Sequence, residues 1–299
     1  MEPTIRIANP SHAVVLNNHL QEENICLLNL NLRYFNASSC VTVYYCARVK
    51  YCSINQTSKV NAILNKSDFS GKIALVTGGS GAVGSTLLDF FTSHGASTVG
   101  TYLSESSIDS SHSKSGMADL YRCNTMNNAE VVSLVNAIAK KYGRIDILVN
   151  TVGGFIGGKS VVNLEEEEWN KMFGLNLLSA FLITKHVVPL MLRSGYGKIV
   201  HISSYTGVSA QGLDSAYASS KAGLIRFVES VSKEFKDHNL TINCVLPSII
   251  DTKANREMMP DANFMQWVAI DDLVNVIAFL SSDGSRAISG SAIPVIKAT

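Results

Sequence analysis

Short apolar runs alternate with longer amphipathic segments from residue 70 to the end of the chain. Lys72–Thr77 is a continuous apolar run of strand length, and Val83–His94 carries apolar residues at helical spacing. The alternation continues with predicted strands at Ser97–Thr101, Leu120–Cys123, Ile145–Asn150, Gly197–Ser203, Thr241–Leu246 and Ser291–Ile296, and with predicted helices at Ala129–Tyr142, Glu165–Leu192, Ala216–Phe235 and Ile270–Leu280. Strands that alternate with helices predict an α/β fold, in which a parallel sheet carries helices on both faces.

Residues 1–66 lack this period. Apolar clusters there are interrupted by Asn, Ser and Cys, and no basic cluster leads into a long apolar run as in a secretory signal. The pattern predicts an irregular, poorly ordered N-terminal extension over residues 1–66, followed by one domain over residues 67–299. An alternative is a natural start near residues 64–68, which would need a non-Met codon because the next methionine after Met1 is Met117.

Composition and charge exclude several classes of protein. Of the 299 residues, 46% are hydrophobic and 16% are charged, which excludes a chain that is disordered throughout. The formal net charge is +1, so no basic field favours a nucleic-acid partner. Uninterrupted apolar runs are shorter than the roughly 18–20 residues of a membrane-spanning helix, so no membrane partner is expected.

The six cysteines include no Cys-x-x-Cys pair, and no Cys/His set has zinc spacing, so no metal site is predicted. Four of them lie in the first 52 residues, where a disulfide set stays open. The C-terminal two thirds has the cysteine usage of a reduced, cytoplasmic chain. The carboxylates of Glu165–Glu168 suit the start of a helix capped by Asn163 better than they suit a metal site, because negative charge is favourable there.

A glycine-rich loop joins the first predicted strand to the first predicted helix. Its sequence over Thr77–Gly84 is Thr-Gly-Gly-Ser-Gly-Ala-Val-Gly. Glycines let a backbone turn tightly and approach a diphosphate, whose charge then meets the N-terminus of the following helix. The loop predicts dinucleotide binding, against the alternative of an ordinary glycine-rich turn. The residues expected to contact the dinucleotide are Gly78, Ser80, Gly81, Val83 and Gly84.

This loop resembles the Thr-Gly-x-x-x-Gly-x-Gly motif of the classical short-chain dehydrogenases/reductases, with Ala82 in place of the middle glycine. The resemblance covers residues 70–296, with the motifs of the family in the order of the family. It implies a single-domain, Rossmann-type, doubly wound parallel sheet and a nicotinamide cofactor. It also implies hydride transfer between that cofactor and a small-molecule carbonyl or alcohol substrate.

The same resemblance implies further cofactor contacts. They are Thr101 at the end of the second strand, Asn124 and Thr125 beside the adenine, Asn150, Val152 and Gly153 along the adenine ribose, Tyr217 and Lys221 at the nicotinamide ribose, and Pro247, Ile250 and Thr252 at the carboxamide. No carboxylate ends the second strand to bind the ribose hydroxyls of NAD, and Thr101 or Ser104 could take a 2′-phosphate, which favours NADP. Gly81 stands where many NADP-using members have Arg, so NAD stays open.

A Tyr-x-x-x-Lys motif opens the predicted helix Ala216–Phe235. Tyr217 and Lys221 lie four residues apart and share a helix face, so the ammonium is expected to lower the pKa of the phenol. By resemblance, Tyr217 transfers the proton and Lys221 tunes it. The resemblance also assigns substrate binding to Ser204, with Ser203 as the neighbouring alternative, and a helix kink that holds a relay water to Asn176.

Three hypotheses of function follow. The catalytic set and the strand end at residues 99–101 resemble 3-oxoacyl-carrier-protein reductases, which favours reduction of a 3-oxoacyl group or another ketone. Residues 78–85, 153–158 and 245–267 resemble dihydropteridine reductases, but those enzymes lack the active-site Ser and carry the acidic residue that selects NAD. A dinucleotide sensor without catalysis is disfavoured because Tyr217 and Lys221 are retained.

Several other features have structural interpretations. Members of the family pair through helices that match Glu165–Leu192 and Ala216–Phe235, so a homodimer or homotetramer is expected by resemblance. Trp169 and Met172 are expected to face the core because of their helical spacing.

The remaining unusual side chains fall near the predicted cleft. His201 is expected to be a core or groove histidine, and Cys123 and Cys244 to be small buried hydrophobic residues. The candidates for an apolar lid over the substrate pocket are Met258, Met259 and Trp267.

Overall fold

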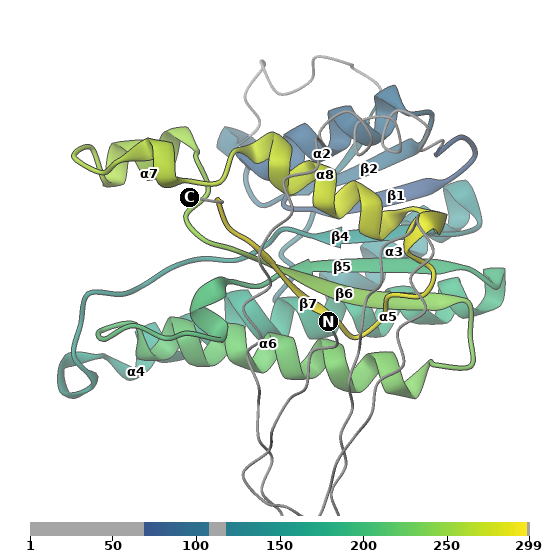
Figure 1. Cartoon of the computed structure of the whole chain (residues 1–299). Coiled ribbons are helices and arrows are strands. Elements are labelled where there is room, and N and C mark those ends of the chain that lie inside the picture. The colour runs from purple at the N-terminus through teal and green to yellow at the C-terminus, as the bar shows by residue number, and fades with distance from the viewer. Residues whose placement is uncertain (1–68, 108–117, 298–299) are drawn as a thin grey trace, which may run out of the picture. The chain divides into compact units, whose positions relative to one another are not determined.

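The described part of the chain, residues 69–107 and 118–297 of a computed structural model, forms a seven-stranded parallel sheet (Figure 1). The strands are β1 (Ile73–Thr77), β2 (Ser97–Tyr102), β3 (Asp119–Arg122), β4 (Ile147–Asn150), β5 (Gly197–Ile202), β6 (Leu240–Pro247) and β7 (Ala292–Val295). Their order in the sheet is β3-β2-β1-β4-β5-β6-β7. The connection after β1 therefore runs toward β2 and the connection after β4 runs the opposite way, toward β5, so a crevice opens between the carboxyl ends of β1 and β4.

Helices cover both faces of this sheet. α2 (Ala82–Ser93) and α8 (Ile270–Ser281) pack on one face, and α3 (Asn128–Tyr142), α5 (Ser179–Ser194) and α6 (Ser215–Glu234) pack on the other. The shorter helices are α4 (Glu166–Phe173) and α7 (Lys253–Met258). Successive strand residues alternate between the two cores, as Leu75 and Val76 of β1 do, because side chains of a strand point to opposite faces. The predicted Rossmann-type, doubly wound sheet is confirmed.

The described domain begins at Phe69. This side chain is 2% exposed, and its ring packs edge-on against Phe91 with centroids 5.0 Å apart. The predicted extension over residues 1–66, the alternative start near residues 64–68 and the disulfide set in the first 52 residues all lie outside the described residues.

The predicted helix Glu165–Leu192 differs from the observed structure in its details. A π-helical turn, η3 (Gly174–Leu178), separates α4 from α5. The prediction that Asn163 caps the helix is wrong, because Asn163 ends a separate 3-10 turn and the N-cap is Glu165, whose N–H donates to the Glu168 carboxylate at 3.2 Å. The prediction that Trp169 faces the core is also wrong. Trp169 is 36% exposed and stacks on Phe173, whereas Met172 is buried as predicted.

Residues Glu166–Ser194, taken as one helix, are long and apolar enough to cross a membrane by length and composition alone. In this structure 56% of the most apolar window is buried inside the domain. α5 places Ile183, Val187 and Met191 in the core beneath the sheet. Packing against the sheet therefore accounts for the hydrophobicity of this helix.

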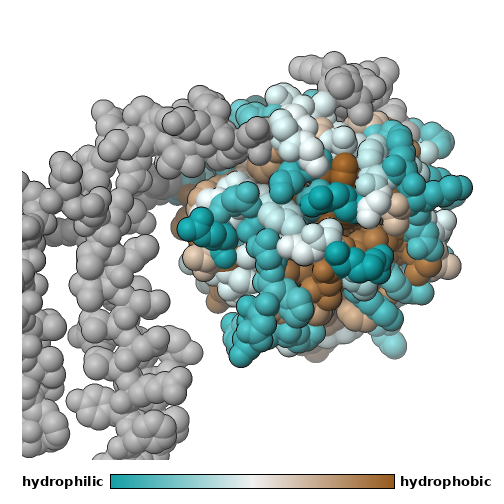
Figure 2. Space-filling model, turned by 90° about the vertical axis from the view of Figure 1, so that its right-hand side faces the viewer, coloured by the Kyte–Doolittle hydropathy of each residue, from teal (hydrophilic) through white to brown (hydrophobic). Residues whose placement is uncertain are grey.

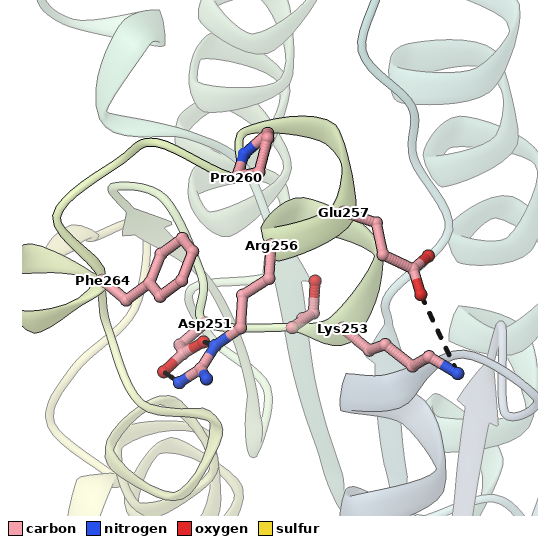
Figure 3. Close-up of a pocket in the computed structure, with 7 residues that line it drawn as sticks. Asp251, Lys253, Arg256, Glu257, Pro260 and Phe264 are labelled. Carbon is pink, nitrogen blue, oxygen red and sulfur yellow. Dashed lines mark hydrogen bonds and ion pairs between the residues drawn. The ribbon is translucent and has the colours of Figure 1, made fainter.

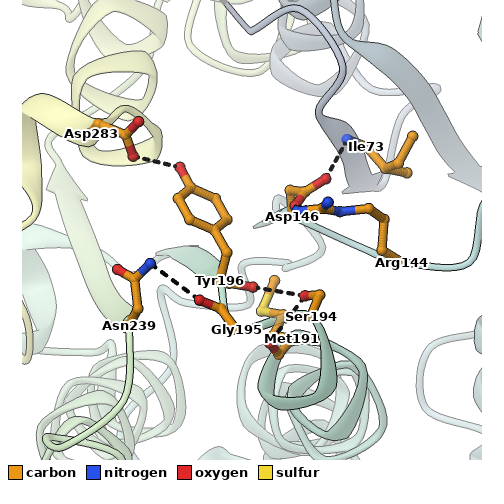
Figure 4. A network of polar contacts seen from close by, with 9 residues as sticks. All are labelled: Ile73, Arg144, Asp146, Met191, Ser194, Gly195, Tyr196, Asn239 and Asp283. Atoms are coloured by element: carbon orange, nitrogen blue, oxygen red, sulfur yellow. Dashed lines mark hydrogen bonds and ion pairs between the residues drawn. The ribbon is translucent and has the colours of Figure 1, made fainter.

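Polar side chains close the edge of the sheet where the strands begin (Figure 4). Asp146 is fully buried, pairs with Arg144, and accepts the Ile73 N–H at 2.9 Å. Tyr196, just before β5, donates to Asp283 Oδ1 at 2.9 Å. One bond joins the start of β1 to the residue before β4, and the other joins the residue before β5 to the turn after α8, so these polar groups are paired at this edge of the sheet.

The domain surface in Figure 2 shows hydrophilic residues interspersed with smaller hydrophobic patches.

Candidate active site

The glycine-rich loop runs from the end of β1 into α2. Gly78 has a φ of +71°, which L side chains rarely adopt, and Gly81 is the N-cap of α2 with no side chain to cap it. A Cβ on Gly84 would lie 2.1 Å from the Gly78 carbonyl oxygen, so only glycine fits where the helix passes the loop. The N–H groups at the start of α2 are therefore free to bind a diphosphate at close range.

A cleft of about 720 Å³ lies in the crevice between β1 and β4. Most of the predicted cofactor residues line it, namely Gly78, Ser80, Gly81, Val83, Gly84, Thr101, Asn124, Thr125, Val152, Gly153, Ile250 and Thr252. Asn150 lies behind the wall, where it is 1% exposed and accepts the Thr77 hydroxyl at 2.5 Å. Pro247 closes β6 and is also buried. These two positions brace the cleft rather than line it. Tyr217 and Lys221, also predicted as cofactor contacts, are not among the residues that line it.

Two of the predicted polar contacts are already used within the protein. Thr101 is 1% exposed and its hydroxyl oxygen accepts the Gly78 N–H at 3.0 Å, so it supports the glycine loop. Asn124 accepts the Met126 N–H at 3.1 Å through its side-chain oxygen. Tyr102 and Leu103 line the cleft immediately after Thr101, although the sequence analysis did not identify them. Their place at the end of a predicted strand was the available signal.

Ser204 and Tyr217 lie together beside this cleft, and Ser204 is 7% exposed. The Ser204 hydroxyl accepts the Thr206 N–H at 3.2 Å, and its proximity to the phenol lowers the pKa of Tyr217. Ser203 is 2% exposed and donates to the Lys221 carbonyl at 2.9 Å, so its hydroxyl is committed to the backbone. Of the two serines, only Ser204 is therefore placed to act with Tyr217.

The ionisation of Tyr217 differs from the expectation. Burial raises the pKa of Tyr217, the hydrogen bond with Ser204 lowers it, and the charge of Asp214 raises it. Lys221 does not lower the pKa as predicted, because its ammonium lies 5.9 Å from the ring centroid and donates to the Ile202 carbonyl at 2.9 Å. Tyr217 consequently stays protonated at neutral pH, which is the state that can give a proton to a carbonyl oxygen.

Lys221 and Asn176 converge on Gly153 in the loop after β4. A Cβ on Gly153 would lie 3.0 Å from Asn176 Oδ1 and 3.1 Å from Lys221 Nζ. Asn176 lies in the π-helical turn, fully buried, and its amide accepts the Gly154 N–H at 2.9 Å and donates to Ser220 Oγ at 3.0 Å. Burial lowers the pKa of Lys221 to about 8. The side chain of Asn176 thus holds the loop, and its role toward a relay water stays a prediction.

The segment after β6 contributes Ile250, Thr252, Lys253, Ala254 and Glu257 to the wall of the cleft. Thr252 caps α7 by accepting the Asn255 N–H at 3.2 Å. Lys253 and Glu257, whose charged atoms are 3.8 Å apart, line the cleft, and the sequence analysis did not identify them. Their i, i+4 spacing directly after the predicted Thr252 was the signal that could have found them.

A second pocket of about 630 Å³ lies against α7 and shares Thr252, Lys253 and Glu257 with the cleft (Figure 3). The guanidinium of Arg256 in this pocket is already paired. It binds both carboxylate oxygens of Asp251 at 2.6 and 2.7 Å and lies 4.8 Å from the Phe264 ring centroid. Of the predicted lid residues, Met258 is 67% exposed, whereas Trp267 is 5% exposed and belongs to the core beneath the segment. The lid is therefore less apolar than the sequence indicated.

The other singled-out side chains are structural. His201 is fully buried, lies 3.1 Å from the Thr184 hydroxyl through Nε2, and has its pKa lowered to about 3 by burial, so it is neutral. Cys123 and Cys244 are free and buried, and burial raises the pKa of Cys123 to about 11 and of Cys244 to about 12. Residues 69–107 and 118–297 contain no group of three or more His, Cys, Asp or Glu side chains that could hold a metal.

Comparison with known proteins identifies relatives along most of the chain. A family model described as short chain dehydrogenase matches residues 72–263. The 3-oxoacyl-(acyl-carrier-protein) reductase FabG of Escherichia coli is 32% identical over 237 residues, which cover 76% of this chain and 97% of that protein. The reductase of the same name from Thermotoga maritima is 30% identical and covers 75% of this chain and 96% of that protein.

Solved structures share the fold. The crystal structure of NAD⁺-bound xylitol dehydrogenase has a TM-score of 0.70 at 22% identity, with 77% of this chain and 99% of that chain covered. At Gly84 the helix passes so close to the backbone of the glycine loop that no side chain fits, and the start of α2 has no side-chain cap. Both features fit the diphosphate of a nicotinamide dinucleotide. Family, fold and cleft agree, and the chain belongs to the short-chain dehydrogenase family as an NAD(P)-dependent oxidoreductase that acts on carbonyl or alcohol groups.

Proposed function

We propose that this chain reduces 3-oxoacyl thioesters, or ketones of similar form, with NADPH as the favoured cofactor. The observation that carries the proposal is the pairing of the Ser204 hydroxyl with a Tyr217 phenol that burial keeps protonated. Two adjacent O–H groups can both donate to one carbonyl oxygen, which favours reduction. The named activity of the FabG relatives, which are 32% and 30% identical, supports the 3-oxoacyl group as the substrate class.

The residues act on the carbonyl oxygen in a simple sequence. Ser204 holds the oxygen and orients the C=O bond, and Tyr217 gives its proton to that oxygen as the carbon is reduced. When bound, the nicotinamide supplies the hydride that completes the alcohol. Lys221 is placed to contact the nicotinamide ribose, because its ammonium already lies against Ile202 and Gly153 at the cleft wall. The π-helical turn of Asn176 holds the water that returns a proton to Tyr217.

The preference for NADP rests on the wall at the end of β2. Tyr102 and Leu103 line the cleft there and neither is a carboxylate that would repel a 2′-phosphate. Arg122 Nε donates to the Leu103 carbonyl at 3.3 Å, which brings a guanidinium to this end of the cleft. Arg122 thus supplies a cation for the 2′-phosphate, in place of the Arg that many NADP-using members of the family have at the position of Gly81. The hydroxyl of Thr101 is engaged by the glycine loop, so we assign the phosphate contact to Arg122 and Ser104.

The test follows oxidation of NADPH and NADH by the full chain with an acetoacetyl thioester and with a quinonoid dihydropterin. Turnover of the thioester with NADPH that is lost in Tyr217→Phe supports the proposal. No observation in the structure or the comparisons favours the dihydropteridine-type alternative, and turnover of the pterin alone would overturn the proposed substrate. Binding of cofactor without turnover of any ketone would indicate a sensor instead of an enzyme.

Assembly, domain limits and location complete the proposal. We infer a homodimer or homotetramer that pairs through the α4–α5 and α6 faces, where Trp169, Leu178 and Phe181 are 36%, 42% and 40% exposed. Residues 67–299 are proposed as the catalytic domain, with residues 1–66 as an extension. A cytoplasmic location is proposed because both described cysteines are reduced and buried. Light scattering on the wild type and on Phe181→Asp tests the assembly, and a monomeric wild type would overturn it.

A further inference from the structure

Two loops from different parts of the chain meet over the ring of Tyr217. Phe155, in the loop after β4, packs its ring edge-on against Tyr217 with centroids 4.9 Å apart and an interplanar angle of 84°. The N–H of Gly158 in the same loop donates to the carbonyl of Leu213, in the loop before α6, at 3.0 Å. The substrate side of the phenol is therefore bounded by both loops at once.

Asp214 is placed in this contact without a partner for its carboxylate. It is the N-cap of α6, a position where Asp normally accepts backbone N–H groups, yet its side chain makes no capping bond. No hydrogen bond or ion pair joins the carboxylate to any other residue in the described ranges. A Cβ on Gly157 would lie 2.4 Å from Asp214 Oδ1 and 2.4 Å from Phe155 Cζ, so the carboxylate and the ring flank the same glycine.

The backbone beside Asp214 is held in an unfavourable conformation. Leu213 has a φ of +71°, the single positive value for a non-glycine residue in the described part of the chain. The left-handed region costs an L residue roughly 1–2 kcal/mol. The bond from Gly158 to the Leu213 carbonyl holds this conformation. Leu213 directly precedes Asp214, whose Oδ1 lies beside Gly157 of the β4 loop and does not cap α6.

We propose that the Asp214 carboxylate makes the enzyme select 3-oxo substrates that carry no negative charge near the reacting carbonyl, so that thioesters and esters are reduced and free 3-oxo acids are rejected. The inference rests on the proposed reduction of 3-oxoacyl groups. Once Ser204 and Tyr217 hold the ketone oxygen, the carboxylate of a free 3-oxo acid is only two carbons from the reacting centre. It must then lie near a second carboxylate, that of Asp214, and two like charges repel.

The field of Asp214 reaches the reacting position. Its charge raises the pKa of the Tyr217 phenol, so it is felt at the oxygen that binds the substrate. The other charged group that faces Tyr217 is Lys221, on the next turn of α6, and its ammonium is bonded to the Ile202 carbonyl. Phe155, whose ring lies against Tyr217 and beside the same glycine as Asp214, links the two side chains in space. An effect of about tenfold on kcat/KM is expected for partly screened charges at this range.

The experiment compares methyl acetoacetate with acetoacetate, which differ by one methyl group and one charge. The full chain is assayed by NADPH oxidation, and the measured quantity is the ratio of kcat/KM for the ester to kcat/KM for the acid. We expect the ratio to fall about tenfold in Asp214→Asn and to be retained in Asp214→Glu, which keeps the charge. Asp271→Asn, at an exposed position in the first turn of α8 that does not line the cleft, controls for loss of a surface carboxylate.

A second measurement on the wild type keeps the inference testable if a variant does not fold. Repulsion between charges is screened by salt, so the ratio should fall as KCl is raised, while kcat/KM for the ester stays constant. The inference would be overturned if the ester-to-acid ratio of kcat/KM changed neither in Asp214→Asn nor with KCl. It would also be overturned if the wild type reduced acetoacetate as well as its ester. Failure to reduce the ester, the acid and the acetoacetyl thioester alike would instead overturn the proposed function.

Discussion

Gly84 offers the sharpest perturbation of the cofactor cleft. In Gly84→Ala the added methyl carbon would lie 2.1 Å from the Gly78 carbonyl oxygen, 2.8 Å from its carbonyl carbon and 2.9 Å from Gly79 Cα. All three neighbours are backbone atoms, so no side chain can rotate away to relieve the contact. Either α2 or the glycine loop must move by about an ångström, and both carry the diphosphate site.

The size of the effect follows from the overlap. Forced overpacking of this kind costs typically 1–3 kcal/mol, and the backbone location puts Gly84→Ala at the upper end, about 3 kcal/mol. For a domain of this size, 1 kcal/mol shifts Tm by roughly 2–4 °C, so the expected fall is about 6–12 °C. A displacement of the binding loop by 1 Å weakens positioning as well, so the Kd for NADPH should rise by about tenfold or more.

Urea unfolding followed by circular dichroism gives the stability change, and quenching of protein fluorescence by NADPH gives the Kd. Gly212→Ala is the matched control, because a Cβ at Gly212 meets nothing within 4 Å. If Gly84→Ala unfolds at the same urea concentration as Gly212→Ala and binds NADPH equally well, then the loop can open freely. The account of this glycine as a close backbone approach would then be refuted.

Three further predictions concern the proton donor Tyr217, the proposed 2′-phosphate contact of Arg122 and the ion pair between Asp146 and Arg144. Tyr217→Phe should lower kcat for ketone reduction by about 10²–10⁴-fold with little change in the Kd for NADPH. The wild-type kcat/KM for NADPH should fall as pH rises through about 8, because Lys221, which we propose contacts the nicotinamide ribose, loses its proton there, and a flat profile to pH 10 would contradict this. Arg122→Gln should raise KM for NADPH but not for NADH, measured by initial rates, and an equal rise for both would exclude a 2′-phosphate contact. Asp146→Asn should lower the free energy of unfolding in urea by about 1.5 kcal/mol, because the buried side chain loses its charge-assisted bonds to Arg144, which is 40% exposed and stays solvated. A change within about 0.5 kcal/mol, as for a surface substitution, would show that the pair is not stabilising.

Much of this fold was predictable from periodicity, because parallel strands that are buried on both faces are nearly continuous apolar runs. Lys72–Thr77 and Gly197–Ser203 were identified on that basis and form β1 (Ile73–Thr77) and β5 (Gly197–Ile202). The glycine loop and the Tyr-x-x-x-Lys pair were equally visible, because their chemistry depends on residues close in sequence. Such local signals need no knowledge of tertiary contacts.

The errors arose where a long-range contact decides the outcome. Trp169 has core spacing, yet it is 36% exposed and stacks on Phe173 instead of entering the core. The expected lowering of the Tyr217 pKa failed because Lys221 bonds to Ile202 of β5, a partner nineteen residues away in sequence. The carboxylate of Asp214 and its neighbour Phe155 were missed for the same reason, since their loops meet only in the folded chain.

The π-helical turn at Gly174–Leu178 makes the length of this helix a functional quantity. A π turn accommodates one more residue than an α turn, so it acts as a single-residue insertion held within a continuous helix. Deleting one residue there would restore α geometry and rotate everything before it by about 100° relative to α5. Asn176 would leave Gly154, and the loop that positions Gly153 against Lys221 would lose its anchor. A length change in this helix therefore alters chemistry even when every named catalytic residue is kept.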